Sequence, residues 1–243
     1  MSKQRALIVW GGWNGHHPEI IANIFRNILE ESGFEVDSRF DLGAFGDLDY
    51  LRSLDLIIPH WTMGTIDNAL VQNVSEAVAS GVGLAGCHGG MCDAFRGEVL
   101  WQFITGGTWV AHPGGDGVEH AIEITAGENP LLEGLSSFKV STEQYYLHVD
   151  PAVTVHAVTR FPNPLARWYH SSNKPADVPM VWTKTWGHGR VFYCALGHDP
   201  SLFEIPELRE IMRRGFVHAA AGKIHAVEND LSLDAFKSDR QMF

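Results

Sequence analysis

The stretch Val82-Gly-Leu-Ala-Gly-Cys-His-Gly-Gly90 decides the fold of this chain. Its first five residues are small or apolar, which predicts a short buried strand. Small residues then flank Cys87, in the small-x-Cys-x-small pattern of a sharp turn from a strand into a helix. We therefore expect a strand-turn-helix unit here, with one side chain projecting from the turn.

Alternating strands and helices precede this unit. Helical spacing of apolar residues predicts two amphipathic helices, each closed by a glycine. Short apolar or alternating runs predict the strands between them. This β-α-β alternation is typical of a parallel sheet with helices on both faces and right-handed crossovers. The predicted strands cover residues 5–10, 34–40, 54–59 and 82–86, and the helices cover residues 19–32 and 66–80.

The second half of the chain is richer in strands. Two strand-like runs are separated only by Trp186-Gly-His-Gly189, which predicts a β-hairpin. We find no repeat and no flexible linker, so residues 1–224 are assigned to one domain. Residues 225–243 are assigned to a C-terminal tail, loose or packed on a neighbouring subunit of a homo-oligomer. Strands are predicted at 118–125, 138–141, 153–160, 179–185 and 190–195, and a closing helix at 205–221.

The composition excludes several classes of protein. The 243 residues are 45% hydrophobic, which excludes a disordered chain. The net charge of −11 disfavours nucleic acid and anionic membrane surfaces as partners, whereas a neutral sugar is compatible with it. There is no apolar run of transmembrane length. The three cysteines form no disulfide framework, so we interpret them as reduced thiols of a cytoplasmic protein.

Two loops rich in glycine and histidine follow predicted strands, at residues 11–17 and 87–90. Sites in parallel sheets form outside the carboxyl ends of the strands, so these loops are expected to share a pocket. In the turn itself either Cys87 or His88 could project into that pocket. A thiolate at Cys87 would be activated by a helix N-terminus and a nearby base. The alternative is a buried, inert cysteine beside an active His88.

Two further residues are candidates for proton transfer. His198 follows the last predicted strand and could reach the crevice from the other side. Glu143 stands near aromatic residues and could act as a general base. His112 and His148 complete the candidates. There is no HExxH, CxxC or Walker motif, so no cofactor is assigned with certainty; a divalent metal is left open, because several histidines and Glu143 could converge.

The residues together resemble the ThuA-like family, which is associated with bacterial trehalose utilisation. The resemblance covers about residues 5–222. It implies an α/β fold similar to class I glutamine amidotransferases: a flavodoxin-like three-layer α/β/α sandwich with a mainly parallel central sheet and an added β-hairpin. It rests on Gly83-Leu-Ala-Gly-Cys-His88, Gly106-Gly-Thr-Trp-Val-Ala-His112, Glu143 with Tyr145, Pro179-Met-Val-Trp182, Gly187-His-Gly-Arg-Val-Phe-Tyr193 and Leu196-Gly-His198.

The resemblance implies a role in the metabolism of trehalose or a related disaccharide, through a keto-disaccharide made by a partner dehydrogenase. Family members commonly carry an aliphatic or aromatic residue at the position of Cys87 and retain the histidine, which favours His88. Amidotransferases pair their cysteine with a late His-x-Glu, but Pro200 stands where that Glu would be. The triad is therefore incomplete.

These considerations give one preferred function and two alternatives. In the preferred one, a sugar-modifying enzyme uses His88, Glu143 and His198 to move protons beside a ketone. One alternative is an amidotransferase-like hydrolase that uses Cys87, and the other is a non-catalytic sugar-binding protein. The residues expected to contact the sugar are Trp13, His16, His112, Tyr145 and Trp182.

Overall fold

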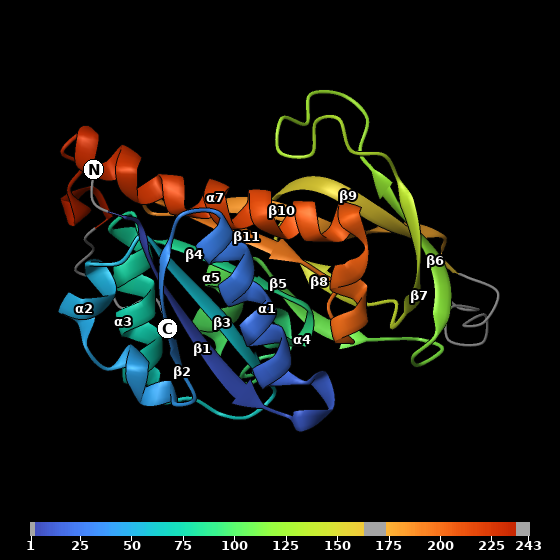
Figure 1. Cartoon of the computed structure of the whole chain (residues 1–243), viewed down its shortest axis with the longest axis horizontal. Helices are drawn as coiled ribbons and strands as arrows, with labels where there is room; N and C mark the ends of the chain where they lie inside the picture. Colours follow the sequence, from blue (N-terminus) through green and yellow to red (C-terminus); the bar gives the residue numbers. More distant parts are fainter. Residues whose placement is uncertain (1–2, 163–173, 237–243) are drawn as a thin grey trace.

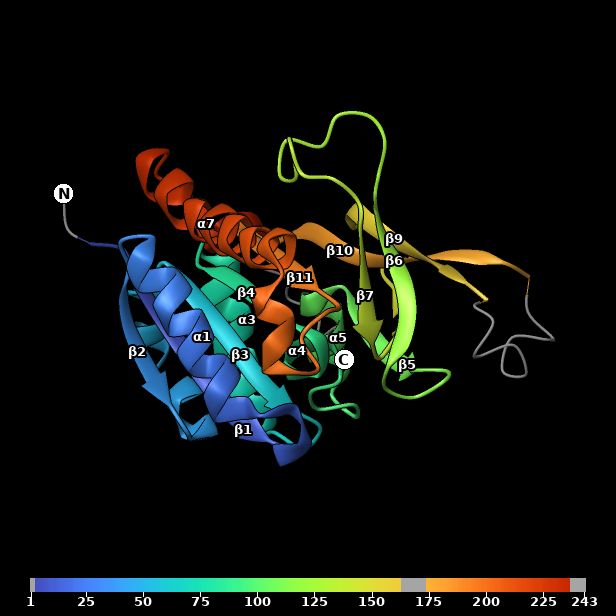
Figure 2. The same ribbon diagram turned by 45° about the vertical axis from the view of Figure 1, so that its right-hand side comes forward.

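A computed structural model describes residues 3–162 and 174–236 of the chain. A nine-stranded sheet runs through the molecule in the order β2-β1-β3-β4-β11-β10-β9-β6-β7 (Figures 1 and 2). Its strands are β1 (Arg5–Gly12), β2 (Glu35–Arg39), β3 (Leu56–Thr62), β4 (Gly83–Cys87), β6 (Val118–Ile124), β7 (Phe138–Thr142), β9 (Thr154–Phe161), β10 (Ala176–Trp186) and β11 (Gly189–Cys194). A second sheet pairs β5 (Gly107–Ala111) with β8 (Tyr146–Val149).

Helices cover both faces of the parallel part of the sheet. One face is covered by α1 and α7, which contact each other, and the opposite face by α3, which contacts α2 and α5 (Figure 1). The helices are α1 (Pro18–Glu31), α2 (Leu48–Arg52), α3 (Asn68–Ala79), α4 (His88–Cys92), α5 (Val99–Thr105) and α7 (Pro206–Glu228), and short 3-10 turns are η1 (Asn14–His16), η2 (Leu42–Phe45), η4 (Pro200–Glu204) and η5 (Leu233–Phe236). Among the described residues no helix is long and apolar enough to cross a membrane.

The pairing of the strands confirms the predicted architecture. β1 is parallel to β2 and β3, and β4 is parallel to β3 and β11. β10 and β11 form the predicted hairpin and pair antiparallel through Trp186 and Gly189. β9, β6 and β7 extend the sheet antiparallel beyond β10, at the end of the molecule away from α1 (Figure 2). The fold is therefore a mainly parallel α/β sandwich with added antiparallel strands.

The core lies between the parallel strands and their helices. Leu7, Ile8 and Val9 of β1 are fully buried, because helices cover both faces of a parallel strand. From α1, Phe25 packs edge-on against Phe216 of α7. Each such side chain contributes roughly 1.5–3 kcal/mol through burial, so the parallel half forms a rigid base for the loops at its edge.

The structure corrects the predicted end of the last helix. α7 continues to Glu228 instead of ending at residue 221, and η5 follows it. The late buried positions of α7 are small residues, Gly222 and Ala226, which give a weak apolar periodicity. These small residues let the end of α7 approach the loop at Gly81 closely. A Cβ added to Gly81 would lie only 2.5 Å from the Cβ of Ala226. The proposed tail thus starts inside a packed helix, and its residues 237–243 lie outside the described residues.

Candidate functional site

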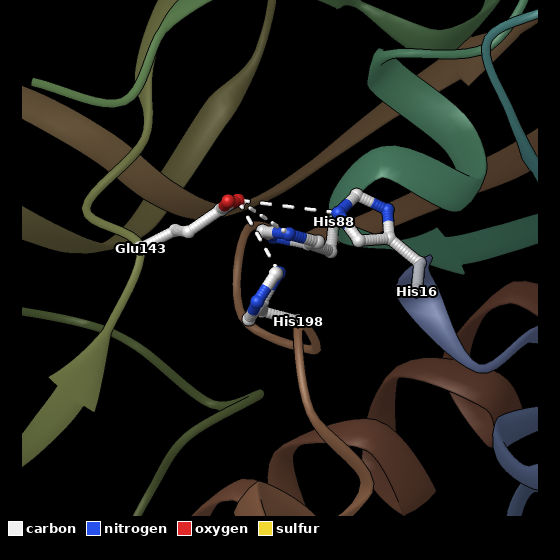
Figure 3. A group of neighbouring side chains, drawn as sticks. All are labelled: His16, His88, Glu143 and His198. Carbon is white, nitrogen blue, oxygen red and sulfur yellow. Dashed lines mark ion pairs between the residues drawn. The ribbon is translucent and has the colours of Figure 1, made fainter. Parts of the chain in front are cut away.

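Four predicted site residues converge at the carboxyl edge of the sheet. His16 lies in η1 after β1, His88 begins α4 after β4, Glu143 connects β7 to β8, and His198 follows β11. One ligand atom from each side chain lies within 4.8 Å of those of the other three. Figure 3 shows the three imidazole rings facing the carboxylate of Glu143. The predicted convergence is confirmed, whereas the chemical roles of these residues stay predictions.

One oxygen of Glu143 is the centre of this group. Its Oε2 lies 3.2 Å from Nε2 of His88, 3.4 Å from Nδ1 of His198 and 4.0 Å from Nε2 of His16 (Figure 3). The other oxygen, Oε1, lies 3.7 Å from Nε2 of His112. His16, His88 and Glu143 are buried, whereas the side chain of His112 is 38% exposed. The site therefore has a buried interior and a partly exposed histidine at its edge.

The backbone decides which residue of the turn reaches the site. His88 has the left-handed φ of 46°, which is unusual for a residue other than glycine, and Cys87 before it is extended. The turn is therefore centred on His88, one of the two residues that the sequence pattern leaves open, and not on Cys87. Stacking on Tyr145, at a centroid distance of 3.9 Å, fixes the imidazole of His88.

Cys87 points into the protein interior. It is fully buried, and a Cβ on Gly197 would come within 2.7 Å of its Sγ. Burial raises the pKa of the Cys87 thiol well above its usual value, and Cys194 raises it further. Nothing in these surroundings favours a reactive thiolate.

Hydrogen bonds to Nδ1, the ring nitrogen farther from Glu143, orient the imidazoles of His88 and His16. Nδ1 of His88 donates to the carbonyl oxygen of Ala195 at 2.8 Å. Nδ1 of His16 is 2.9 Å from Oγ1 of Thr62. Gly89 makes room for this second ring, because a Cβ there would lie 2.6 Å from Cε1 of His16. The glycine after His88 is thus required by the packing of the site.

Burial and mutual proximity set the protonation states. Burial lowers the pKa of His16 to about 2, helped by His88, and burial also lowers the pKa of His88. Burial alone would raise the pKa of Glu143, but the neighbouring imidazoles, with His88 first, lower it to about 2. Near neutral pH the site therefore combines neutral imidazoles at His16 and His88 with an ionised carboxylate at Glu143, the forms of these side chains that bind metal ions.

A cavity of about 270 Å³ opens beside the cluster. Trp13, His16, His112 and Tyr145, which the sequence predicts to contact a sugar, line it, and Glu143 reaches it from the cluster. Their contact with a sugar stays a prediction. The apolar ring faces suit the apolar face of a sugar. Trp182 lies elsewhere: it is fully buried, and its indole donates to the carbonyl of Thr105. The exposed His148 also lies outside this cavity and lines another pocket.

The cavity also contains residues that the sequence analysis missed. The guanidinium of Arg96 lies 4.3 Å from the ring centroid of Trp109 and pairs with the buried carboxylate of Asp93. All three residues line the cavity. The spacing Asp-x-x-Arg was the only available signal, and such pairs are common on protein surfaces. Met63, on the same wall, has a left-handed φ of 59°.

Comparisons with known proteins give one family model and several solved structures that share the fold. A family model described as ThuA, trehalose utilisation, matches residues 5–219. The chain is similar to the structure of a ThuA-like protein from Bacteroides uniformis, with 19% identity, a TM-score of 0.68 and coverage of 88% of this chain and 89% of that chain. A ThuA-like protein from Parabacteroides merdae gives 17% identity, a TM-score of 0.70 and 91% coverage of both chains.

The chain is also similar to the structure of a protein from Salmonella typhimurium LT2 that is described as cytoplasmic, with 14% identity and a TM-score of 0.61. The match covers 89% of this chain and 99% of the Salmonella protein. At these identities the structures show the shared fold. A search of the curated proteins gives no significant match.

Proposed function

Since the chain belongs to the ThuA family of trehalose utilisation, we propose that it is an enzyme of bacterial carbohydrate utilisation that acts on a keto-disaccharide. The reaction is proton transfer at the carbon next to the ketone. The observation that carries this proposal is the buried carboxylate of Glu143, held against imidazoles beside a cavity with aromatic walls. This combination provides bases, a route for protons and a surface for a sugar ring.

We propose the following role for each group. The sugar ring stacks against Trp13 or Trp109, with its ketone directed toward the cluster. A base of the cluster removes the proton beside the ketone, and Glu143 stabilises the imidazolium that forms if that base is His88. The enolate then takes up a proton on another atom, or expels a glycosidic oxygen that is protonated as it leaves. His112 lies at the entrance, where it exchanges protons between Oε1 of Glu143 and solvent.

Proton exchange in heavy water tests this function without knowledge of the product. The purified protein is incubated in D₂O with a keto-disaccharide, with the unoxidised disaccharide as the matched control substrate. We expect deuterium to enter beside the ketone, followed by isomerisation or cleavage, and no change in the control. Glu143→Gln should slow the exchange by about 10²–10⁴-fold. Tight binding of the sugar without exchange or cleavage would instead establish a non-catalytic binding protein.

The proposal also covers the cellular location and the oligomeric state of the protein. The three cysteines are buried and unpaired, which supports a reducing, cytoplasmic location. Val227 and Phe236, near the end of the described chain, are 67% and 50% exposed, which supports a homo-oligomer that covers them. Light scattering of the purified protein measures the oligomeric state, and a monomer at micromolar concentration contradicts this assignment.

A further inference from the structure

Three buried polar atoms of the cluster have no hydrogen-bond partner: Nε2 of His88, Nδ1 of His198 and Oε2 of Glu143. Burial of an unpaired polar group costs about 1–3 kcal/mol, and more where the group is charged. All three atoms face the same space (Figure 3). Such a concentration of unpaired atoms at one point is suited to a ligand that interacts with all of them.

The tautomer of His88 indicates that the missing ligand carries a positive charge. A carbonyl oxygen can only accept, so the hydrogen bond to Ala195 places the ring proton on Nδ1. In the neutral ring Nε2 then carries a lone pair, and it points at the ionised Oε2 of Glu143 from 3.2 Å. Two acceptors at that distance repel each other unless a proton or a metal ion lies between them.

We propose that His16, His88, His198 and Glu143 bind one divalent transition-metal ion. Tetrahedral Zn²⁺ with ligand bonds of about 2.0–2.1 Å separates its ligand atoms by roughly 3.3–3.4 Å. The two shortest separations from Oε2 of Glu143 are 3.2 and 3.4 Å, to His88 and His198. The separation from His16 is longer, 4.0 Å, and would have to shorten when the ion binds.

The surroundings of the ligands have the features of a metal site. Metal-binding histidines are usually oriented by a hydrogen bond to the other ring nitrogen. Ala195 provides this contact for His88, and Thr62 provides it for His16. Three imidazoles and one carboxylate favour Zn²⁺, Fe²⁺, Co²⁺ or Ni²⁺ over Mg²⁺ and Ca²⁺, which prefer oxygen ligands.

The ion would change the chemistry of the proposed function. A nitrogen that binds the ion no longer serves as a base, so proton transfer would fall to Oε1 of Glu143 and to His112, which lie 3.7 Å apart. With one carboxylate ligand, the centre keeps a net positive charge, and two of its ligand residues, His16 and Glu143, line the cavity. A ketone or hydroxyl oxygen of a sugar in this cavity can approach the ion, which would polarise a carbonyl and stabilise an enolate. In this respect the inference rests on the proposed function, but the binding of the ion is measured separately from any activity.

Metal analysis and titration test the inference. The protein is produced without a histidine tag, its metal content is measured, and the chelator-treated chain is titrated with Zn²⁺ and Co²⁺ by calorimetry and visible absorption. We expect one ion per chain, with the intense visible bands of Co²⁺ at low coordination number. His88→Gln and Glu143→Gln should each weaken binding by at least about tenfold. His112→Gln is the matched control, because this residue contacts Glu143 from outside the four ligands, and it should retain the ion.

The outcomes separate the inference from the proposed function. Absence of Zn²⁺ and Co²⁺ binding to the wild-type chain overturns the metal site, and so does equal binding by wild type, His88→Gln and Glu143→Gln, which would be adventitious binding elsewhere. If the ion binds as expected but no keto-disaccharide reacts, the metal site stands and the proposed function fails. If the metal-free protein is fully active, the proposed function stands and the metal site has no part in it.

Discussion

His88 owes its position to a single backbone dihedral angle. The left-handed φ of this residue turns its side chain toward Glu143, while extended Cys87 remains in the core. We therefore expect Cys87→Ala to retain activity on a keto-disaccharide, and His88→Ala to lose about 10²–10⁴-fold. Initial rates, with circular dichroism as the check on folding, measure both. A folded Cys87→Ala variant with a large loss of rate would reverse this assignment in favour of the thiol.

At the scale of the element, the turn into α4 depends on two glycines. Gly89 faces the ring of His16, and a Cβ on Gly90 would lie 2.3 Å from Nδ1 of the buried His60. We expect Gly89→Ala to push His16 away from Glu143, and thus to lower activity and metal affinity about tenfold or more. Gly97→Ala is the matched control, because no atom lies within 4 Å of its Cβ position. Equal affinities for the two variants would show that His16 is not held by this contact.

The same elements show how far the sequence could predict the site. Helical and strand periodicity predicted the parallel sheet. Its topology then placed His16, His88 and His198 at one edge, because the carboxyl ends of parallel strands lie at the same edge of the sheet. The position of Glu143 could not be derived in this way. It lies between β7 of the main sheet and β8 of the small one, and β5 and β8 are too short for a clear alternation. The elbow pattern was also ambiguous, because sequence alone does not give φ.

At the scale of the whole molecule, burial of neutral histidines links stability to pH. His156 of β9 is 7% exposed and joins three segments: its Nδ1 is 2.8 Å from Oδ1 of Asn129, and its Nε2 is 2.8 Å from Oγ1 of Thr183 in β10. Burial, with His218 in support, lowers the pKa of His156 from 6.5 to about 4. Burial also lowers the pKa of His60 to about 3. The folded protein thus excludes protons that its unfolded chain binds.

We expect the free energy of unfolding to fall as the pH decreases from 6.5 toward 4, because in that range the unfolded chain protonates His156 and the folded chain does not. A histidine with this shift contributes a slope of up to about 1.4 kcal/mol per pH unit, or roughly 3.4 kcal/mol between pH 6.5 and 4. Screening by solvent lowers this total to about 2 kcal/mol. His156→Gln should flatten the dependence by that amount in urea titrations at a series of pH values, whereas the exposed His148→Gln should not. Identical slopes for wild type and His156→Gln would show that the acid sensitivity arises elsewhere, with the buried His60 as the next residue to replace.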